Sequence, residues 1–401
     1  MKWPLKSKRM SLCRISQSAV LAACVIALSS CNIIRGYRAD GLYGPNIFSF
    51  EHHVLDTVAR GESSFQFKVV ESGYEWSDTL HFYNTPPRCI NQTFPEAMNS
   101  LSTNQGVMII HDDSIVYEKY WGDFSADRMA TIFSVSKSIT SLLCGIAVDE
   151  GYIESIDDPV TKYLPNLKGR DPRWEMLTIR YLLNMFSGLD FDDEYEFNIK
   201  ALKTVSAIAR LNYGHNLERQ IRGLKFRCDP GTSFRYESMT TAILGVVIEH
   251  ATGRHFAEYL SEKIWKPLQM ESVALVNIDS PKHHVGHAFG GITCTVKDLA
   301  KIGRLYLNKG MWNGKRIVSE EWIHLTTDFY PDTCYKYGWY DVRYENFETG
   351  QYPGFYAVGI CAQVLYVNPH KNLIMVRIGR HNNGWSIVPV VFEQLSDRWP
   401  D

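Results

Sequence analysis

The sequence lacks the compact ligand clusters from which metal sites are usually built. None of its nine cysteines lies in a C-x-x-C pair, and no H-E-x-x-H motif occurs. Three cysteines fall within the first 31 residues, and the other six are scattered: Cys89, Cys144, Cys228, Cys294, Cys334 and Cys361. Their spacing does not choose among the possible disulfide pairings. Cys144 and Cys361 lie inside apolar runs, so we expect them to be buried thiols. We expect neither a metal nor a cofactor.

The chain also has little excess charge of either sign. Its 42 Lys and Arg residues nearly balance its 44 Asp and Glu residues, which gives a formal net charge of -2. Proteins that bind a phosphate backbone carry a basic patch or stripe, and none is present here. We therefore do not expect nucleic acid to be a partner.

The apolar stretch near the N-terminus is too short to span a bilayer comfortably. It runs from Ala19 to Leu28, follows five basic residues and precedes two serines, which is the layout of a secretory signal. Leu28-Ser29-Ser30-Cys31 also resembles a bacterial lipobox, in which the cysteine becomes lipidated. We expect a membrane anchor on Cys31, and Asn32 favours the periplasm-facing outer membrane of the bacterial cell envelope. The alternative is an ordinary signal peptide with a chance cysteine.

The order of the expected elements predicts a mixed α and β fold. Gly106–Trp121 and Val364–Ile378 each predict a β-hairpin. The sequence between them is mostly helical, and Trp385–Trp399 predicts a closing helix. This order favours the α/β (α+β) class, with an antiparallel sheet built from both chain ends and flanked by helices. An inserted, mostly helical subdomain is expected at roughly residues 150–285.

We divide the chain into three parts. Residues 1–30 are the expected lipoprotein signal peptide, 31–95 form an N-terminal extension, and 96–401 form the main domain. The role of the extension stays open. Within the helical part, Thr178–Ser187 predicts a helix that ends before Gly188.

The segment Ser134-Val135-Ser136-Lys137 is the first candidate for chemistry. It opens an amphipathic run, so Ser134 is expected at the N-terminus of a helix. Lys137 lies three residues on and therefore shares the face of Ser134. A serine alcohol is a poor nucleophile unaided, and a neighbouring amine supplies the missing base. S-x-x-K is the nucleophile motif of penicillin-binding proteins and serine β-lactamases. The alternative is a helix N-cap followed by a solvated lysine.

Further motifs follow in order and give a specific resemblance. They are FSVSKS at Phe133, DDPVTKYLP at Asp157, TIRYLLNMFSGL at Thr178, PGTSFRYES at Pro230, GGITCTVKDLAKIGRLYLNKG at Gly290 and AVGICAQVLYVNP at Ala357. Over roughly residues 100–395 the chain resembles the serine β-lactamase-like superfamily, and it is most similar to the branch of 6-aminohexanoate-dimer hydrolases. The resemblance implies a β-lactamase/transpeptidase-like fold and a serine hydrolase.

The resemblance also implies roles for individual residues. Ser134 would be the acylated nucleophile and Lys137 its proton acceptor. Tyr236 matches the tyrosine of the Y-x-N or Y-x-S motif, and its phenol would relay the proton to the leaving group. Ser238, third in that motif, would hydrogen-bond the lysine or cap a helix. Tyr195 is a candidate substrate contact, or else a surface aromatic.

The third motif of the superfamily departs from its usual form. Ala357-Val358-Gly359 stands where K-T-G or H-T-G is normal, so a cation that pairs with a substrate carboxylate is missing. This relaxed form resembles the amide- and ester-cleaving branch. Gly359 would let a substrate approach closely. The main-chain N–H groups of Ser134 and Ile360 would form the oxyanion hole, because backbone donors do not depend on side-chain identity.

Together these features predict a serine hydrolase that cleaves an amide or ester bond in a small molecule. One alternative is a D,D-peptidase or β-lactamase that acts on cell-wall peptides or β-lactams. Another is a surface-anchored binding protein without catalysis. His287 and His381 are interpreted as structural or rim residues. The natural substrate, the oligomeric state and the primary base, Lys137 or Tyr236, stay open.

Overall fold

The computed structural model describes most of the chain in eleven ranges, with gaps between them. These are residues 35–36, 40, 45–71, 76, 79–84, 88–101, 103–193, 202–329, 333–342, 354–380 and 387–400. The expected signal peptide and Cys31 lie outside them, as do Tyr195 and His381. Among the helices in these ranges, none is both long and apolar enough to cross a membrane.

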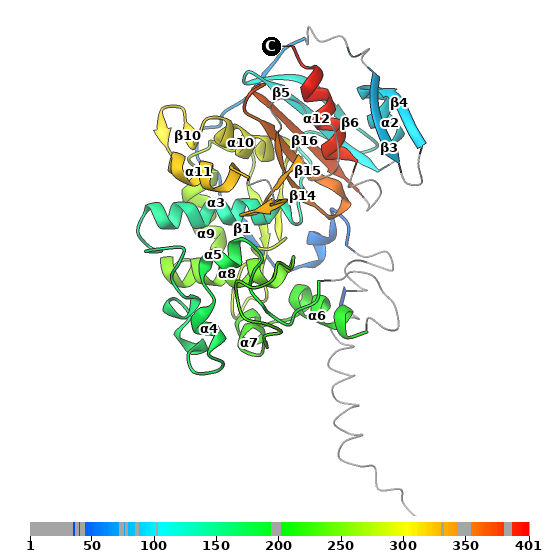
Figure 1. Cartoon of the computed structure of the whole chain (residues 1–401). Helices are drawn as coiled ribbons and strands as arrows, with labels where there is room; N and C mark the ends of the chain where they lie inside the picture. The colour runs from blue at the N-terminus through cyan, green and yellow to red at the C-terminus, as the bar shows by residue number, and fades with distance from the viewer. Residues whose placement is uncertain are drawn as a thin grey trace, which may run out of the picture.

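An eight-stranded sheet forms the centre of the molecule and joins the two ends of the chain (Figure 1). Its order is β12-β13-β14-β15-β16-β5-β6-β2, and every pair is antiparallel except β2 with β6. The strands are β2 (Lys68–Val69), β5 (Asn104–His111), β6 (Ser114–Tyr120), β12 (Tyr335–Lys336), β13 (Trp339–Asp341), β14 (Phe355–Gly359), β15 (Gln363–Asn368) and β16 (Leu373–Gly379). The pairing of β16 with β5 confirms the antiparallel sheet predicted from both chain ends.

Residues that alternate along the strands divide the core between the two faces of this sheet. On β5, Val107 and Ile109 pack in the cluster that includes Phe392 of α12 (Val388–Arg398) and residues of α2 (Phe94–Ser100). Met108 and Ile110 belong to the larger cluster on the opposite face. That face is covered by α3 (Val135–Asp149), α10 (Val296–Leu307) and α11 (Glu320–Thr327) (Figure 1).

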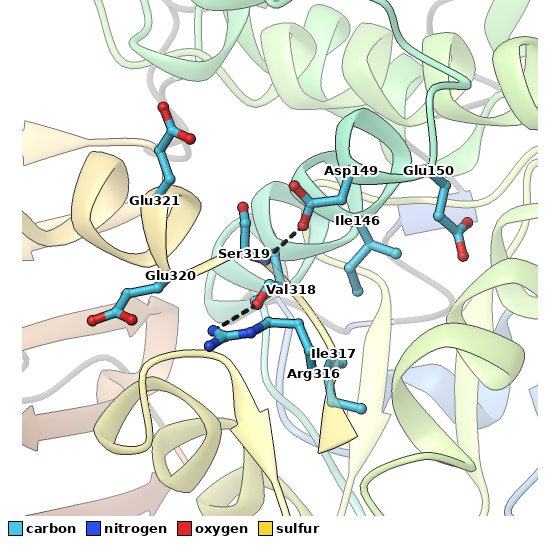
Figure 2. A pocket seen from close by; sticks show the side chains of 9 residues that line it. All are labelled: Ile146, Asp149, Glu150, Arg316, Ile317, Val318, Ser319, Glu320 and Glu321. Carbon is cyan, nitrogen blue, oxygen red and sulfur yellow. Dashed lines mark hydrogen bonds between the residues drawn. The ribbon is translucent and has the colours of Figure 1, made fainter. Parts of the chain in front are cut away.

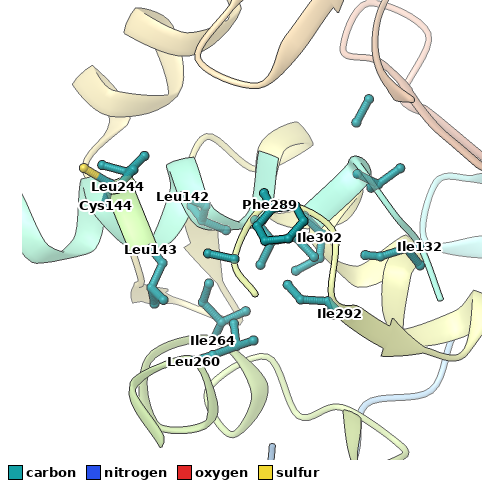
Figure 3. Close-up of a cluster of buried hydrophobic side chains, with 14 of the residues drawn as sticks. Ile132, Leu142, Leu143, Cys144, Leu244, Leu260, Ile264, Phe289, Ile292 and Ile302 are labelled. Atoms are coloured by element: carbon teal, nitrogen blue, oxygen red, sulfur yellow. The ribbon is translucent and has the colours of Figure 1, made fainter. Parts of the chain in front are cut away.

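The helical part of the chain packs below the sheet in Figure 1. It contains α4 (Arg173–Met176), α5 (Ile179–Leu183), α6 (Leu202–Tyr213), α7 (Leu217–Arg222), α8 (Ser238–Thr252) and α9 (Phe256–Leu260), which continues as a π-helical turn, Ser261–Trp265. Short 3-10 turns cover Ser49–His52, Val160–Lys162, Pro165–Leu167 and Ile360–Ala362. Figure 3 shows Leu142 and Leu143 of α3 buried among side chains that include Leu244 of α8 and Leu260 of α9.

One predicted helix is shorter than the sequence suggested. The segment expected to be helical over Thr178–Ser187 forms α5 only as far as Leu183. Met185 has a φ of 63°, which a right-handed helix does not accommodate. The following residues are thereby free to form the turn that leads to Gly188.

A smaller four-stranded antiparallel sheet positions the start of α3. Its order is β1 (Leu55–Val58), β8 (Ala274–Asn277), β9 (Ile292–Cys294) and β7 (Ala130–Thr131). Two hairpins lie apart from both sheets, β3–β4 (Thr79–Asn84 and Arg88–Thr93) and β10–β11 (Met311–Trp312 and Lys315–Arg316). Because β1 pairs with β8, part of the expected N-terminal extension is built into the sheet that leads to Ser134.

Candidate active site

Ser134 stands at the junction between strand β7 and helix α3. The turn places Phe133 at a φ of 47°, and Ser134 occupies the N-cap position with a φ of -65°. Its hydroxyl makes no capping hydrogen bond, and the residue is only partly buried. The side chain is therefore available for chemistry, at the positive end of the α3 dipole.

Lys137 is buried, and its amine is surrounded by oxygen atoms. Only 2% of the residue is exposed. Nζ lies 2.9 Å from Oγ of Ser134, 3.1 Å from Oγ of Ser238 and 2.8 Å from the carbonyl oxygen of Phe289. The structure thus brings three residues together that are as far as 155 positions apart in the sequence. One face of the amine meets the candidate nucleophile directly.

The ring of Tyr236 lies beside the lysine amine. Nζ of Lys137 is 5.0 Å from the centroid of the Tyr236 ring, within the range of a cation–π contact. The ring of Tyr335 meets that of Tyr236 edge-on, with centroids 5.8 Å apart. Burial, and then the nearby Tyr236 and Tyr335 hydroxyls, raise the pKa of Tyr340 well above its ordinary value. Tyr236 therefore contacts both the lysine and two other tyrosines, Tyr335 and Tyr340.

Ser238 contacts the lysine, as one of its two sequence interpretations suggested. It is the first residue of α8, and Glu237 takes the N-cap position without a side-chain capping bond. The Ser238 hydroxyl lies between Lys137 and Asp193, and it donates to Oδ2 of Asp193 at 2.7 Å. The Ser238 N–H donates to the same oxygen at 2.8 Å. Asp193 thus supplies the acceptor for the first N–H of α8.

Asp193 was not singled out by sequence reasoning. It lies in the segment SGLDFDD among several acidic residues, so its side chain has no distinctive local signal. Burial raises the pKa of Asp193, while Lys137 and the hydrogen bonds from Ser238 oppose this shift. Its Oδ1 atom is buried and accepts no hydrogen bond from the described residues.

Glycine at position 359 allows β14 to approach the nucleophile closely. A Cβ placed on Gly359 would lie 3.0 Å from the Ser134 nitrogen and 2.6 Å from the Ile132 carbonyl oxygen. Ile360 follows directly and begins a 3-10 turn. Ala357, where the superfamily has a cation, is fully buried. The end of β14 is thus pressed against the turn that leads into α3.

A buried arginine fixes the turn after Ile360. Cys361 and Ala362 have positive φ values of 65° and 54°, which are unfavourable for side chains with a Cβ. The guanidinium of Arg377 donates to both of their carbonyl oxygens, at 3.1 and 2.8 Å. It also donates to Asn104 Oδ1 at 2.5 Å and Thr103 Oγ1 at 3.0 Å. Arg377 is fully buried, and burial lowers its pKa to about 10.

Two other titratable groups, Glu237 and His287, lie near the site. Burial raises the pKa of Glu237 to about 7, and hydrogen bonding to Ser187 opposes the shift. Burial lowers the pKa of His287 to about 3. A neutral, fully enclosed imidazole fits the structural role expected for His287. In the described ranges no three His, Cys, Asp or Glu side chains are grouped as metal ligands would be.

An aromatic pocket of about 620 Å³ adjoins the site. Tyr335 and Phe234 line it, and their ring centroids are 6.1 Å apart, while Tyr335 also contacts Tyr236. Phe234 is 44% exposed, so this wall of the pocket faces solvent. The volume is in the range of small-molecule sites.

A second pocket, of about 530 Å³, lies at the far end of α3 (Figure 2). There Asp149 accepts a hydrogen bond from the Ser319 N–H at 2.6 Å. This bond ties the end of α3 to the start of α11. Lys137 and Ser134 lie at the opposite end of the helix, so this pocket is separate from the candidate active site.

Two curated proteins are similar to the chain over part of its length. The 6-aminohexanoate-dimer hydrolase of Paenarthrobacter ureafaciens is 27% identical over 289 residues, which cover 68% of this chain and 71% of that protein. Protein flp of Staphylococcus aureus strain MW2 is 25% identical over 202 residues, which cover 47% of this chain and 39% of that protein.

Solved structures share the fold. A Bacillus anthracis structure named for 6-aminohexanoate-dimer hydrolase superposes with a TM-score of 0.73 at 19% identity, covering 87% of this chain and 91% of that one. The octameric penicillin-binding protein homologue from Pyrococcus abyssi has a TM-score of 0.54 at 23% identity, covering 74% of each chain. These likenesses confirm the β-lactamase/transpeptidase-like fold expected from the sequence.

A family model described as Beta-lactamase matches residues 92–383, which is well over half of the chain. The match includes the S-x-x-K segment, the Tyr236 motif and the glycine of β14. This protein therefore belongs to the beta-lactamase family of hydrolases.

Proposed function

We propose that the protein is a serine hydrolase that cleaves an amide or ester bond in a small molecule through an acyl-enzyme on Ser134. The observation that carries the proposal is the 2.9 Å contact between the buried Lys137 amine and the Ser134 hydroxyl. An amine at hydrogen-bond distance can accept the serine proton as the oxygen attacks a carbonyl carbon.

In the acylation step the Ser134 oxygen bonds to the substrate carbonyl carbon, and the serine proton passes to Lys137. The carbonyl oxygen becomes an oxyanion that accepts hydrogen bonds from the N–H groups of Ser134 and Ile360. Tyr236, in contact with the lysine, relays the proton to the leaving amine or alcohol as the bond to carbon breaks. Two aimed N–H donors stabilise the oxyanion, and loss of one such donor costs on the order of 3 kcal/mol.

In the second step water releases the acyl group. Lys137 and Tyr236 take the proton of the attacking water, and the Ser134 oxygen is reprotonated as it leaves the carbonyl carbon. The two residues are in contact, and neither is assigned alone as the base. Gly359 lets the end of β14 lie close to the Ser134 nitrogen.

The side chains around the site favour a linear amide or ester over a β-lactam or a peptide C-terminus. Such ligands carry a carboxylate, and Ala357 offers no cation to it. The pocket beside Tyr335 has the size of a small-molecule site, and its walls include two cations, Lys336 and Arg180, the latter paired with Asp157. The similarity to 6-aminohexanoate-dimer hydrolase supports amide chemistry. p-Nitrophenyl esters serve as general reporter substrates for the assay.

We further propose that the enzyme is exported and held by a lipid on Cys31 in the bacterial cell envelope, facing the periplasm. The support is the signal-like leader and the lipobox-like Leu28-Ser29-Ser30-Cys31.

The decisive experiment compares wild type and Ser134→Ala on a panel of p-nitrophenyl esters, linear amides and nitrocefin. We expect turnover of esters or amides by the wild type, no turnover by the variant, and fluorophosphonate labelling of the wild type alone. Preferred hydrolysis of nitrocefin or labelling by a fluorescent penicillin would instead identify a β-lactamase or D,D-peptidase. A folded wild-type protein that no probe labels would indicate a binding protein.

A further inference from the structure

The hydrogen bonds around Lys137 determine where the lone pair of its amine points. A neutral amine has two hydrogens and one lone pair, while an ammonium has three hydrogens and none. Nζ has three oxygen neighbours, on Ser134, Ser238 and Phe289. For the neutral amine to act as a base, its lone pair must point at Ser134, so both hydrogens must go to the other two oxygens.

The Phe289 oxygen takes one of these hydrogens in every arrangement. It is a main-chain carbonyl, which accepts hydrogen bonds and cannot donate them. It lies 2.8 Å from Nζ, the shortest of the three contacts. The direction of the lone pair is therefore decided between the two hydroxyl groups, Ser134 and Ser238.

The Ser238 hydroxyl has one hydrogen, and Asp193 takes it. The hydroxyl donates to Oδ2 of Asp193 at 2.7 Å, and the main-chain N–H of Ser238 donates to the same atom at 2.8 Å. With its hydrogen used in this way, the Ser238 oxygen can only accept from Lys137. The second lysine hydrogen is thereby directed at Ser238, and the lone pair is left facing Ser134 at 2.9 Å.

We propose that Asp193 is a positioning residue, which acts through the Ser238 hydroxyl to aim the Lys137 lone pair at Ser134. This inference rests on the proposed serine hydrolase function. Without an acceptor at residue 193, the Ser238 hydroxyl is free to rotate and donate to the lysine. The amine would then point a hydrogen at Ser134, and the serine proton would have no acceptor.

Because these groups are buried, their hydrogen bonds are held in one arrangement. Lys137 and Ser238 are each 2% exposed, so solvent does not replace a missing partner readily. The other Asp193 oxygen, Oδ1, is buried and accepts no hydrogen bond from the described residues. Among the residues that the structure describes, this carboxylate therefore hydrogen-bonds only to Ser238. This arrangement suits a residue whose role is to orient the Ser238 hydroxyl.

The acylation step involves the same bonds and the same proton transfer with Asp193 included. The Ser134 oxygen forms the bond to the carbonyl carbon, its proton moves to the lone pair on Nζ, and the electron pair of the carbonyl goes to the oxyanion. Asp193 gains and loses no proton. Its effect is on the fraction of enzyme in which the lone pair faces Ser134, so it should change kcat and leave KM nearly unaltered.

The test compares Asp193→Leu with Asp193→Asn in the full chain, using a p-nitrophenyl ester and a fluorophosphonate probe. Leucine has similar size and no acceptor, so we expect kcat and the labelling rate to fall about 100-fold, within the usual range for a general base. Asparagine keeps one acceptor oxygen, so we expect recovery to within about tenfold of wild type. Asp190→Leu changes an exposed acid in the same segment and serves as the control.

A double-mutant cycle separates positioning from a purely structural role. Because Asp193 acts through Ser238, Asp193→Leu should slow a Ser238→Ala enzyme by less than about threefold. Multiplicative losses in the double variant, or wild-type kcat in a folded Asp193→Leu enzyme, would overturn the inference. Asp193 also caps α8, so thermal unfolding of each variant is measured alongside. A wild type that fails to turn over or label would instead refute the proposed function.

Discussion

The Cβ position of Gly359 lies 3.0 Å from the main-chain nitrogen of Ser134. This close approach joins the last residue of β14 to the N-cap residue of α3. Gly359 has a φ of -127°, which any residue can adopt, so backbone conformation does not demand glycine here. Glycine is required because a side chain at this position would collide with the backbone beside the Ser134 N–H. The proposed mechanism uses that N–H to bind the oxyanion.

Gly359→Ala is accordingly expected to reduce kcat about 100-fold or more, the effect of losing one oxyanion donor. The added methyl would approach the Ser134 nitrogen and the Ile132 carbonyl and separate β14 from α3. Steady-state kinetics with a p-nitrophenyl ester measure the effect. Gly223→Ala is the control, because φ there is -91° and no atom lies within 3.4 Å of the new methyl. Equal activities in the two variants would exclude this role for Gly359.

Tyr236→Phe should retain the fold and lose the proton relay. The ring contacts with Lys137 and Tyr335 do not need the hydroxyl, and the variant loses only the hydrogen bond with Tyr340, so we expect the melting temperature to fall only slightly. The loss in kcat should be about 100-fold to 10,000-fold, as for other general acid–base groups. Tyr163→Phe is a matched control, since that hydroxyl bonds Asp158. A Tyr236→Phe enzyme with wild-type kcat would remove Tyr236 from the mechanism.

Arg377→Met should destabilise the protein and slow the reaction together. The variant removes four hydrogen bonds and leaves buried oxygens of Thr103, Asn104, Cys361 and Ala362 without their donor. We expect a loss on the order of 3 kcal/mol in the free energy of unfolding, measured in urea. The turn beyond Ile360 would loosen, so kcat should fall as well. Unchanged kcat in the folded variant would mean that the arginine serves stability alone.

Glu393 is expected to make stability decline as pH rises. Burial raises its pKa from 4.5 to about 7, despite hydrogen bonds from Tyr366 and Gly354. The folded state therefore binds the proton more tightly than the unfolded state. Its stabilising contribution is complete below pH 4.5, and it is lost as pH rises to about 7.

Glu393→Gln should remove this decline. The variant should gain stability relative to wild type between pH 5 and pH 8, by an amount on the order of 3 kcal/mol at most. Urea unfolding of both proteins at the two pH values measures the difference. Glu237 titrates in the same window in both proteins, so it cancels in the comparison. A constant difference at all pH values would contradict the assignment.

Cys31→Ala tests the proposed lipid anchor. We expect globomycin to block processing of the wild type, and we expect the variant to lose the lipid and its membrane association. Fractionation and metabolic labelling with a palmitate analogue provide the measurement. Normal processing and membrane association of the variant would show that the lipobox interpretation is wrong.

The local part of the fold could be predicted well from the sequence. The hairpin expected at Gly106–Trp121 forms β5 and β6, and its two aspartates have φ values of 48° and 58°, as a type I′ turn requires. Helix α3 begins after Ser134 as expected, because its apolar residues repeat at helical spacing. The burial of Cys144 and Cys361 is confirmed.

Contacts that join distant segments could not be predicted in the same way. Asp193 meets Ser238 across 45 residues, and only the packed fold brings them together. Arg377 carried a weak signal, because a charge inside the apolar run LIMVRIG is unusual. Its partners Thr103 and Asn104, however, are 274 and 273 positions away in the sequence. The helix expected over Thr178–Ser187 was too long, since tertiary packing at Met185 favours a left-handed turn that periodicity does not reveal.

Helix α3 is enclosed along nearly its whole length, since Val135 through Ala147 are all buried and Gly145 lies against the ring of Trp322. A substitution almost anywhere on it disturbs the interior. The aromatic pocket, in contrast, has walls such as Phe234 that are open to solvent. Over evolutionary time, new specificities can therefore arise by exchange of residues in the pocket walls, while the helix that carries the reaction is inherited almost unaltered.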